Sequence, residues 1–327
     1  MARRRWFGAA AVLVALSLVA AACGDDDDDG AAAPDPGGQD AGSATVEIEM
    51  VDFGYVVSGP LATGVQTIET TNTGAEIHMV GLGRLRDGVT LADVTAALTG
   101  GGEEPDEGGG EEGGDGAGEG DEGGDGEDPF DALFEEEIGS PGHILFPGVT
   151  QRITLEDDLD VGTYALICFI PGEGDGVPHF AKGMIGELQV VEEGGTTDAP
   201  DADGEYRLPD EADPEGTTEI SAGEVTLKVT NDGDIGKDVI VGQVDGDLSV
   251  MDEYFVETFE GEGPPPVGAA GQVPGTIAGM SFEVAPGATI YLTVELSPGT
   301  WHLVSVNNVE GEDGEETTDY ALELTVT

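Results

Sequence analysis

The stretch Pro147–Ile170, PGVTQRITLEDDLDVGTYALICFI, decides the fold class of this chain. Apolar and polar residues alternate in QRITL, and a second apolar run, YALICFI, follows a turn rich in Asp and Gly. Alternation with a period of two is typical of strands that bury one face. Between Ala44 and Glu192 the runs TVEIEMV, VQTIETTN and IGELQVV have the same character. We therefore predict an all-β sandwich or barrel, with one helix in TLADVTAALTG, whose apolar face is Leu91, Val94, Ala97 and Leu98.

The same stretch occurs a second time in the chain. Pro147–Ile170 aligns with PGATIYLTVELSPGTWHLVSV from Pro286 after a gap of two residues, so that Cys168 matches Ser305. GVQTIETTNTGAEIHMVG from Gly64 aligns without a gap with GEVTLKVTNDGDIGKDVIVG from Gly223, so that His78 matches Lys237. An internal repeat of this kind predicts two copies of one β-sandwich.

Composition divides the 327 residues into segments. We expect a first domain over 44–192, a linker over 193–203 in EEGGTTDAPDADG, and a second domain over 204–327. Asp25–Asp29 and Gly100–Asp128 are nearly pure Gly, Asp and Glu, which predicts a disordered tether over 23–43 and a disordered insert over about 99–128.

The first 22 residues have the layout of a bacterial secretory leader. Three arginines precede a short apolar run that ends in VAAAC, and GDDDDD follows at once. This resembles a lipoprotein signal, in which the thiol of Cys23 is acylated and anchors the mature protein to the extracytoplasmic face of the cell membrane. The alternative is a transmembrane anchor, for which the run is short.

Charge excludes one class of partner. The chain has 69 acidic and 10 basic residues, a formal net charge of −59. Such a surface repels phosphate backbones, so we expect no nucleic-acid partner. An acidic surface would suit a basic redox protein such as a cytochrome.

Three residues that can bind a soft metal lie in one loop, CFIPGEGDGVPHFAKGM. Ten residues separate Cys168 from His179, and four separate His179 from Met184. A thiolate, an imidazole and a thioether, completed by a second imidazole, form the ligand set of a blue-copper site. His78, after the turn TNTGAE, is placed to supply that imidazole. Taken singly, Cys168 could be a buried apolar residue, Met184 core filler and His179 an exposed loop residue.

At these residues the first half resembles the cupredoxins, the plastocyanin and azurin family. The N-x-G turn before the first histidine is similar to NTGAEIH, P-G-x-Y-x-x-x-C to VGTYALIC, and the end of the ligand loop to HFAKGM. The resemblance implies two Greek-key sandwiches, the first with one type 1 copper held by His78, Cys168, His179 and Met184, and it implies one-electron transfer. Phe169, Pro178 and Phe180 would supply apolar cover. In the second half Lys237 and Ser305 replace a histidine and the cysteine, so we expect no copper there.

The length of the loop raises the question of enzyme activity. It is closer to that of copper nitrite reductases, but such an enzyme needs a second copper on three more histidines, and only His143 and His302 remain. We expect those two to be structural or solvent-facing and expect no enzyme activity. The alternatives to electron transfer are a non-redox cell-surface binding module, in which Cys168 is merely buried, and copper capture or delivery.

Overall fold

The architecture comes from a computed structural model of the chain. It describes residues 44–100, 132–135, 139–156, 159–192, 198–244, 267–311 and 314–327, together with Val250, Tyr254 and Pro265. The predicted leader, the predicted acylation site at Cys23 and the predicted tether at 23–43 lie outside the described residues. Of the predicted insert at about 99–128, only Thr99 and Gly100 are described, as the last residues of a helix. Among the described helices, none has the length and apolar character needed to cross a membrane.

The strands of the first half and its helices are β1 Thr45–Val51, β2 Gly54–Val57, β3 Leu61–Ala62, β4 Gln66–Asn72, β5 His78–Arg84, α1 Leu91–Gly100, β6 Gly139–Leu145, β7 Thr150–Leu155, β8 Gly162–Ile167, η1 His179–Lys182 (3₁₀) and β9 Ile185–Val191. The second half has β10 Gly204–Leu208, β11 Glu215–Gly216, β12 Glu219–Ile220, β13 Gly223–Asn231, β14 Lys237–Val244, η3 Ala269–Gln272 (3₁₀), β15 Gly275–Val284, β16 Thr289–Leu296, β17 Gly299–Gly311 and β18 Gly314–Val326. The predicted all-β class is confirmed.

Alternating burial explains why these segments form sheets. In β1 the side chains of Val46, Ile48 and Met50 are buried while those between them are exposed, as expected when successive residues of a strand point to opposite faces. The buried set packs against Val80 and Leu166 of the facing sheet. Each fully buried aliphatic side chain of this kind contributes about 1.5–3 kcal/mol.

The predicted repeat is confirmed strand by strand. One sheet of the first sandwich has the order β3-β9-β8-β5-β6, and the matching sheet of the second has the order β12-β18-β17-β14-β15. In both halves a parallel pair, β1 with β4 and β10 with β13, lies beside an antiparallel one. The two copies therefore share topology as well as sequence pattern.

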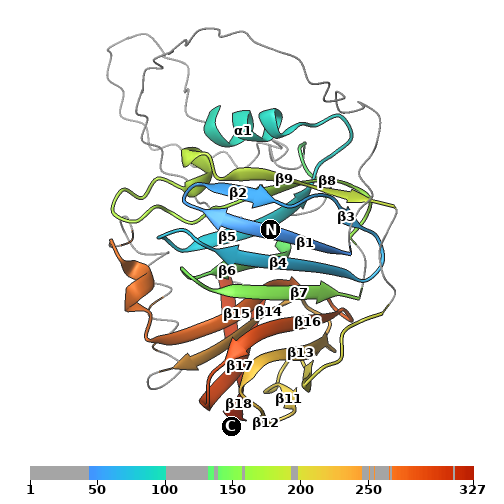
Figure 1. Ribbon diagram of the computed structural model, residues 1–327, viewed down its shortest axis with the longest axis vertical. Helices are drawn as coiled ribbons and strands as arrows, with labels where there is room; N and C mark the ends of the chain where they lie inside the picture. The colour runs from blue at the N-terminus through green and yellow to red at the C-terminus, as the bar shows by residue number, and fades with distance from the viewer. Residues whose placement is uncertain are drawn as a thin grey trace, which may run out of the picture.

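The two sandwiches are joined by more than the linker. Strands β7 and β16 pair antiparallel, which merges the remaining sheets into one of eight strands, β11-β10-β13-β16-β7-β4-β1-β2 (Figure 1). Ile153 pairs with Leu292, its own counterpart in the repeat, so the two copies meet about a local pseudo-twofold axis. Nothing in the sequence pattern had predicted this shared sheet.

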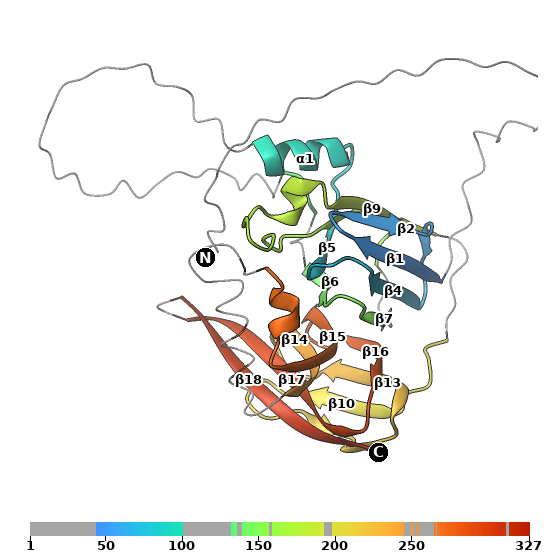
Figure 2. The same ribbon diagram turned by 60° about the vertical axis from the view of Figure 1, so that its left-hand side comes forward.

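Helix α1 covers the outer face of the first sandwich, next to η1 (Figure 2). Thr90 and Asp93 cap its start by reciprocal bonds between their side chains and backbone amides. Val94 is fully buried, but Ala97, predicted on the apolar face, is exposed. The helix packs on Ala165 and Ile167, which is why β8 is buried on both faces rather than alternating.

Candidate metal centre

The approach to His78 is built by an asparagine turn. Asn72, the fully buried last residue of β4, donates from Nδ2 to the carbonyls of Glu76 (2.9 Å) and Leu145 (2.8 Å). Its Oδ1 accepts from the amide of Gly74 at 2.9 Å, the hydrogen bond of an Asx turn. The turn delivers His78 as the first residue of β5, opposite Leu145.

The long loop after β8 folds back on itself. The amide of Gly172 donates to Val177 O, and that of His179 donates to Ile170 O, both at 2.9 Å. Gly174 and Gly176 have φ of +77° and +67°, values that suit glycine. The excursion thereby closes at its base and returns His179, in η1, to the side of Cys168.

The donor atoms of three predicted ligands meet here. Nδ1 of His78 lies 3.1 Å from Nδ1 of His179, which is 3.5 Å from Sγ of Cys168. One ligand atom from each residue lies within 4.8 Å of the other two, and all three residues are fully buried. Among the described residues this is the one such group of His, Cys, Asp and Glu.

Met184 is buried in the same apolar cluster as Cys168. Its amide donates to His179 O at 2.9 Å, and its carbonyl accepts from the amide of Cys168 at 3.3 Å. The backbone thus ties the predicted axial residue to two of the other three. The Cys168 thiol in turn accepts from the amide of Met79 at 3.3 Å.

Each imidazole has a carboxylate behind it, which the sequence did not reveal. Nε2 of His78 lies 3.2 Å from Asp52 Oδ1, and Nε2 of His179 lies 3.0 Å from Glu76 Oε2. A neutral imidazole that donates from Nε2 keeps its lone pair on Nδ1, so both rings aim an acceptor nitrogen into the cluster. Among 69 acidic residues, nothing in the local pattern marks these two.

Burial determines the protonation of the donors. Desolvation lowers the pKa of both His78 and His179, in spite of their carboxylate partners, so both rings are neutral at neutral pH. Desolvation also raises the pKa of Cys168 to about 12. The thiol therefore holds its proton until a metal displaces it.

The aromatic cover differs from the predicted one. Phe53 packs edge-on against both rings, with centroid distances of 5.0 Å to His179 and 6.4 Å to His78. Phe169 and Phe180 instead pack edge-to-face against each other and belong to the cluster under α1, and Pro178 precedes η1 as its N-cap. Phe53 has no sequence signal, since it is one aromatic residue in a tight turn with φ of +64°.

A buried thiol, two imidazole nitrogens and a nearby thioether residue suit copper, because soft sulfur ligands select it and imidazole accommodates it. These residues lie at one end of a two-sheet sandwich, at the positions that the sequence pattern predicted. The fold is cupredoxin-like. His143 and His302 lie elsewhere: His143 is buried on β6 and His302 is half-buried on β17.

Comparison with known proteins finds distant likenesses among solved structures. No protein-family model matches the chain, and no curated protein does. Among solved structures, reduced auracyanin from the photosynthetic bacterium Roseiflexus castenholzii is 21% identical over 46% of this chain and 98% of its own, with a TM-score of 0.27. Auracyanin B is 20% identical over 45% and 88%, at 0.24. A multicopper oxidase is 14% identical over 86% and 88%, at 0.21. With TM-scores this low, the assignment of the cupredoxin-like fold rests on strand order and donor placement.

The second cupredoxin-like sandwich has the same asparagine turn at the corresponding position but lacks the candidate metal ligands. Asn231 repeats the turn of Asn72, bonding to the carbonyls of Ile235 and Val284. At the position of His78, the fully buried Lys237 donates from Nζ to Asp210 Oδ1 (2.7 Å) and Asn307 Oδ1 (3.2 Å). An ammonium cannot ligate a metal, because it has no lone pair. In this copy the ammonium of Lys237 places a positive charge where the first sandwich has a candidate metal ligand.

Proposed function

We propose that the chain is an exported, lipid-anchored blue-copper protein that carries single electrons. One type 1 copper would be held by Cys168, His78, His179 and, as weak axial ligand, Met184. The proposal is carried by one observation: three soft and borderline donor atoms converge in a fully buried cluster. Bound there, copper supplies a reversible one-electron couple.

The surroundings favour a carrier over an enzyme or a delivery protein. Both imidazoles are fixed at Nε2 by carboxylates, and Phe53 packs against both rings. Ligands held in place before metal binding move little when the charge of the metal changes. The three donor residues are fully buried in the described part of the chain, which supports electron exchange rather than direct contact of the metal with a substrate or an acceptor.

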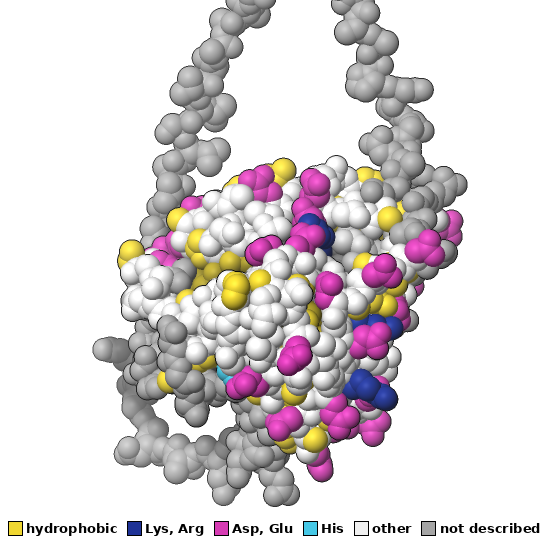
Figure 3. Space-filling view, turned by 60° about the horizontal axis from the view of Figure 1, so that its bottom comes forward, with side chains coloured by type: hydrophobic (Ala, Val, Ile, Leu, Met, Phe, Trp, Pro, Cys, Tyr) yellow, Lys and Arg dark blue, Asp and Glu magenta, His cyan; other side chains and the backbone are white. Residues whose placement is uncertain are grey.

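The membrane anchor and the partner are part of the same proposal. The leader that ends in VAAAC supports acylation of Cys23. Asp and Glu side chains are far more widespread than Lys and Arg on the face shown in Figure 3, which supports a basic redox protein, such as a cytochrome, as partner. A Cys23→Ala variant should then partition into the aqueous rather than the detergent phase, and unchanged partitioning would refute the anchor.

Addition of Cu(II) to the purified chain tests the copper site. We expect an intense thiolate-to-copper band in the visible spectrum that is lost in Cys168→Ser and retained in His302→Asn, the matched control. The band should bleach and return in a reversible one-electron titration. A colourless protein would favour the binding-module alternative, and rapid loss of copper to a chelator in both oxidation states would favour delivery.

A further inference from the structure

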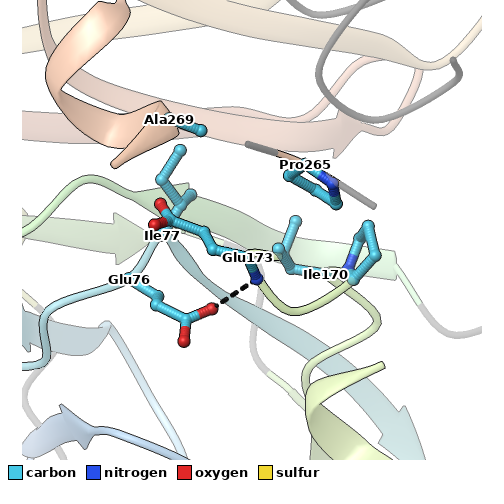
Figure 4. Close-up of a pocket in the computed structure, with 7 residues that line it drawn as sticks. Glu76, Ile77, Ile170, Glu173, Pro265 and Ala269 are labelled. Atoms are coloured by element: carbon cyan, nitrogen blue, oxygen red, sulfur yellow. Dashed lines mark hydrogen bonds between the residues drawn. The ribbon is translucent and has the colours of Figure 1, made fainter. Parts of the chain in front are cut away.

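The second sandwich lies directly against the metal loop. In Figure 4, Pro265 and Ala269 of the second half face Ile77 and the start of the loop at Ile170. The amide of Gly174 donates to Pro265 O at 2.7 Å, and the amide of Gly268 donates to Glu173 Oε2 at 2.5 Å. The tip of the excursion, which has no counterpart in the repeat alignment, is therefore held by the other sandwich.

The backbone amide of Glu173 bonds on the opposite side, toward the ligands. This amide donates to Glu76 Oε2 at 2.8 Å, the same oxygen that lies 3.0 Å from Nε2 of His179. A continuous chain of hydrogen bonds thus runs from Gly268 through Glu173 and Glu76 to His179. Each link involves a carboxylate, and hydrogen bonds to ionised acceptors are among the stronger ones.

A second, apolar contact fixes the other histidine. Ile77, between Glu76 and His78, is 2% exposed. It packs in a cluster with Tyr254, Ile277 and Met280, all from the second half. Because Ile77 and His78 are consecutive, the second sandwich limits the movement of His78 as well.

We infer that the second sandwich is a structural part of the copper centre, with Glu173 as the positioning residue through which it acts on His179. The inference rests on the proposed function and assigns a role to the copy without ligands. It also gives the length of the loop between Cys168 and His179 a role, since Glu173 and Gly174, which contact Gly268 and Pro265, lie in that loop.

The test uses Glu173→Ala in the full chain, with Glu173→Gln and Glu187→Ala as comparisons. Glu187 is exposed on β9 and bonds to Gln189, away from the second sandwich. Outer-shell changes typically cost 10–100-fold in metal affinity, so we expect Glu173→Ala to release copper to a chelator roughly 10–100-fold faster. Glu173→Gln keeps an acceptor oxygen and should stay close to the parent, as should Glu187→Ala.

Hydrogen exchange of the metal-free protein separates this inference from the proposed function. We expect the amides of Gly268 and of the loop around Glu173 to exchange faster in Glu173→Ala, with circular dichroism unchanged. Unchanged exchange would overturn the inference, and so would faster exchange with unchanged copper release. A parent protein that never turns blue would refute the proposed function, while the exchange data would still decide whether the second sandwich holds the loop.

Discussion

At the residue scale, the donor set depends on which nitrogen of each imidazole is hydrogen-bonded to a carboxylate and which one is left for a metal. Asp52 and Glu76 occupy Nε2 of His78 and His179, and the Nδ1 atoms face Cys168. With a thiolate in place, three negative groups would surround one copper ion. Such a shell stabilises Cu(II) more than Cu(I), since the attraction grows with the charge of the ion.

Neutralising one of these carboxylates should therefore raise the reduction potential. We expect Glu76→Gln to raise it on the order of 100 mV, because one charge at this range contributes about 2 kcal/mol at an effective dielectric near 20. Spectroelectrochemical titration of the blue band measures the shift. Glu187→Gln removes a charge that is exposed and therefore screened by solvent, so the potential should change much less; an equal shift in both variants would contradict the local explanation.

Tyr206 has an unusual environment in the second sandwich. The residue is 1% exposed, and its hydroxyl has no hydrogen-bond partner among the described residues. Burial raises the pKa of the phenol from 10.0 to about 12. Between these values the unfolded chain has lost the proton and the folded one has not, so stability falls as the pH rises from 10 toward 12.

Tyr206→Phe should remove both the buried hydroxyl without a partner and the loss of stability at high pH. At neutral pH we expect equal or higher stability, by about 1 kcal/mol, since a buried hydroxyl without a partner is lost. The parent should lose at most ~3 kcal/mol more than the variant between neutral pH and pH 12. Urea unfolding at both pH values checks this, and a variant that is less stable than the parent at neutral pH would show that the hydroxyl is solvated or bonded.

The two asparagine turns allow a matched comparison at the scale of elements. Asn72 and Asn231 make the same pair of side-chain bonds to carbonyls, and both are fully buried. Removing either side chain takes the partner from one buried carbonyl, at about 1–3 kcal/mol, and from one part-buried carbonyl, at a smaller cost. The turns lead into different residues, since one precedes His78 and the other precedes Lys237.

Asn72→Ala and Asn231→Ala should lower the free energy of unfolding by similar amounts, about 2–3 kcal/mol. Only Asn72→Ala should also broaden or shift the blue band and weaken copper binding, because only that turn positions a ligand. Chemical denaturation and copper titration of both variants measure the two effects. A change of the band in Asn231→Ala as large as in Asn72→Ala would contradict this division of roles.

How much the sequence predicts also depends on scale. Strands whose residues alternate, such as Thr45–Val51, were predicted to the residue. Strand β8 ends at Ile167, before the last three residues of the predicted run YALICFI, because Cys168 begins the loop. Short strands such as β2 carry no pattern long enough to read. That His78, Cys168 and His179 meet could be predicted because few residue types bind soft metals, but Asp52 and Phe53 contact the histidines through tertiary structure that leaves no local signal.

At the scale of the whole molecule, the two sandwiches share a sheet and a core. Gln151 of β7 donates from Nε2 to Met280 O (2.8 Å) and accepts from the amide of Met280 (2.9 Å), and all of these groups are buried. Beside this pair, Ile77 and Phe146 of the first sandwich pack with Ile277 of the second. A mixed core of this kind couples the stability of one sandwich to that of the other.

The chain should therefore unfold in a single cooperative transition, although it contains two repeats. Copper at a concentration 100 times its dissociation constant should stabilise the fold by about 2.7 kcal/mol, and the fluorescence of Trp301, buried in the second sandwich, should report the full shift.

Gln151→Ala removes the side chain that bonds to both backbone groups of Met280 and should partly uncouple the two sandwiches. Copper should then shift the calorimetric transition of the first sandwich more than it shifts the fluorescence transition of Trp301. Gln189→Ala, an exposed amide on β9, is the control. Two separate transitions in the parent, with Trp301 insensitive to copper, would show that the shared sheet transmits no stability.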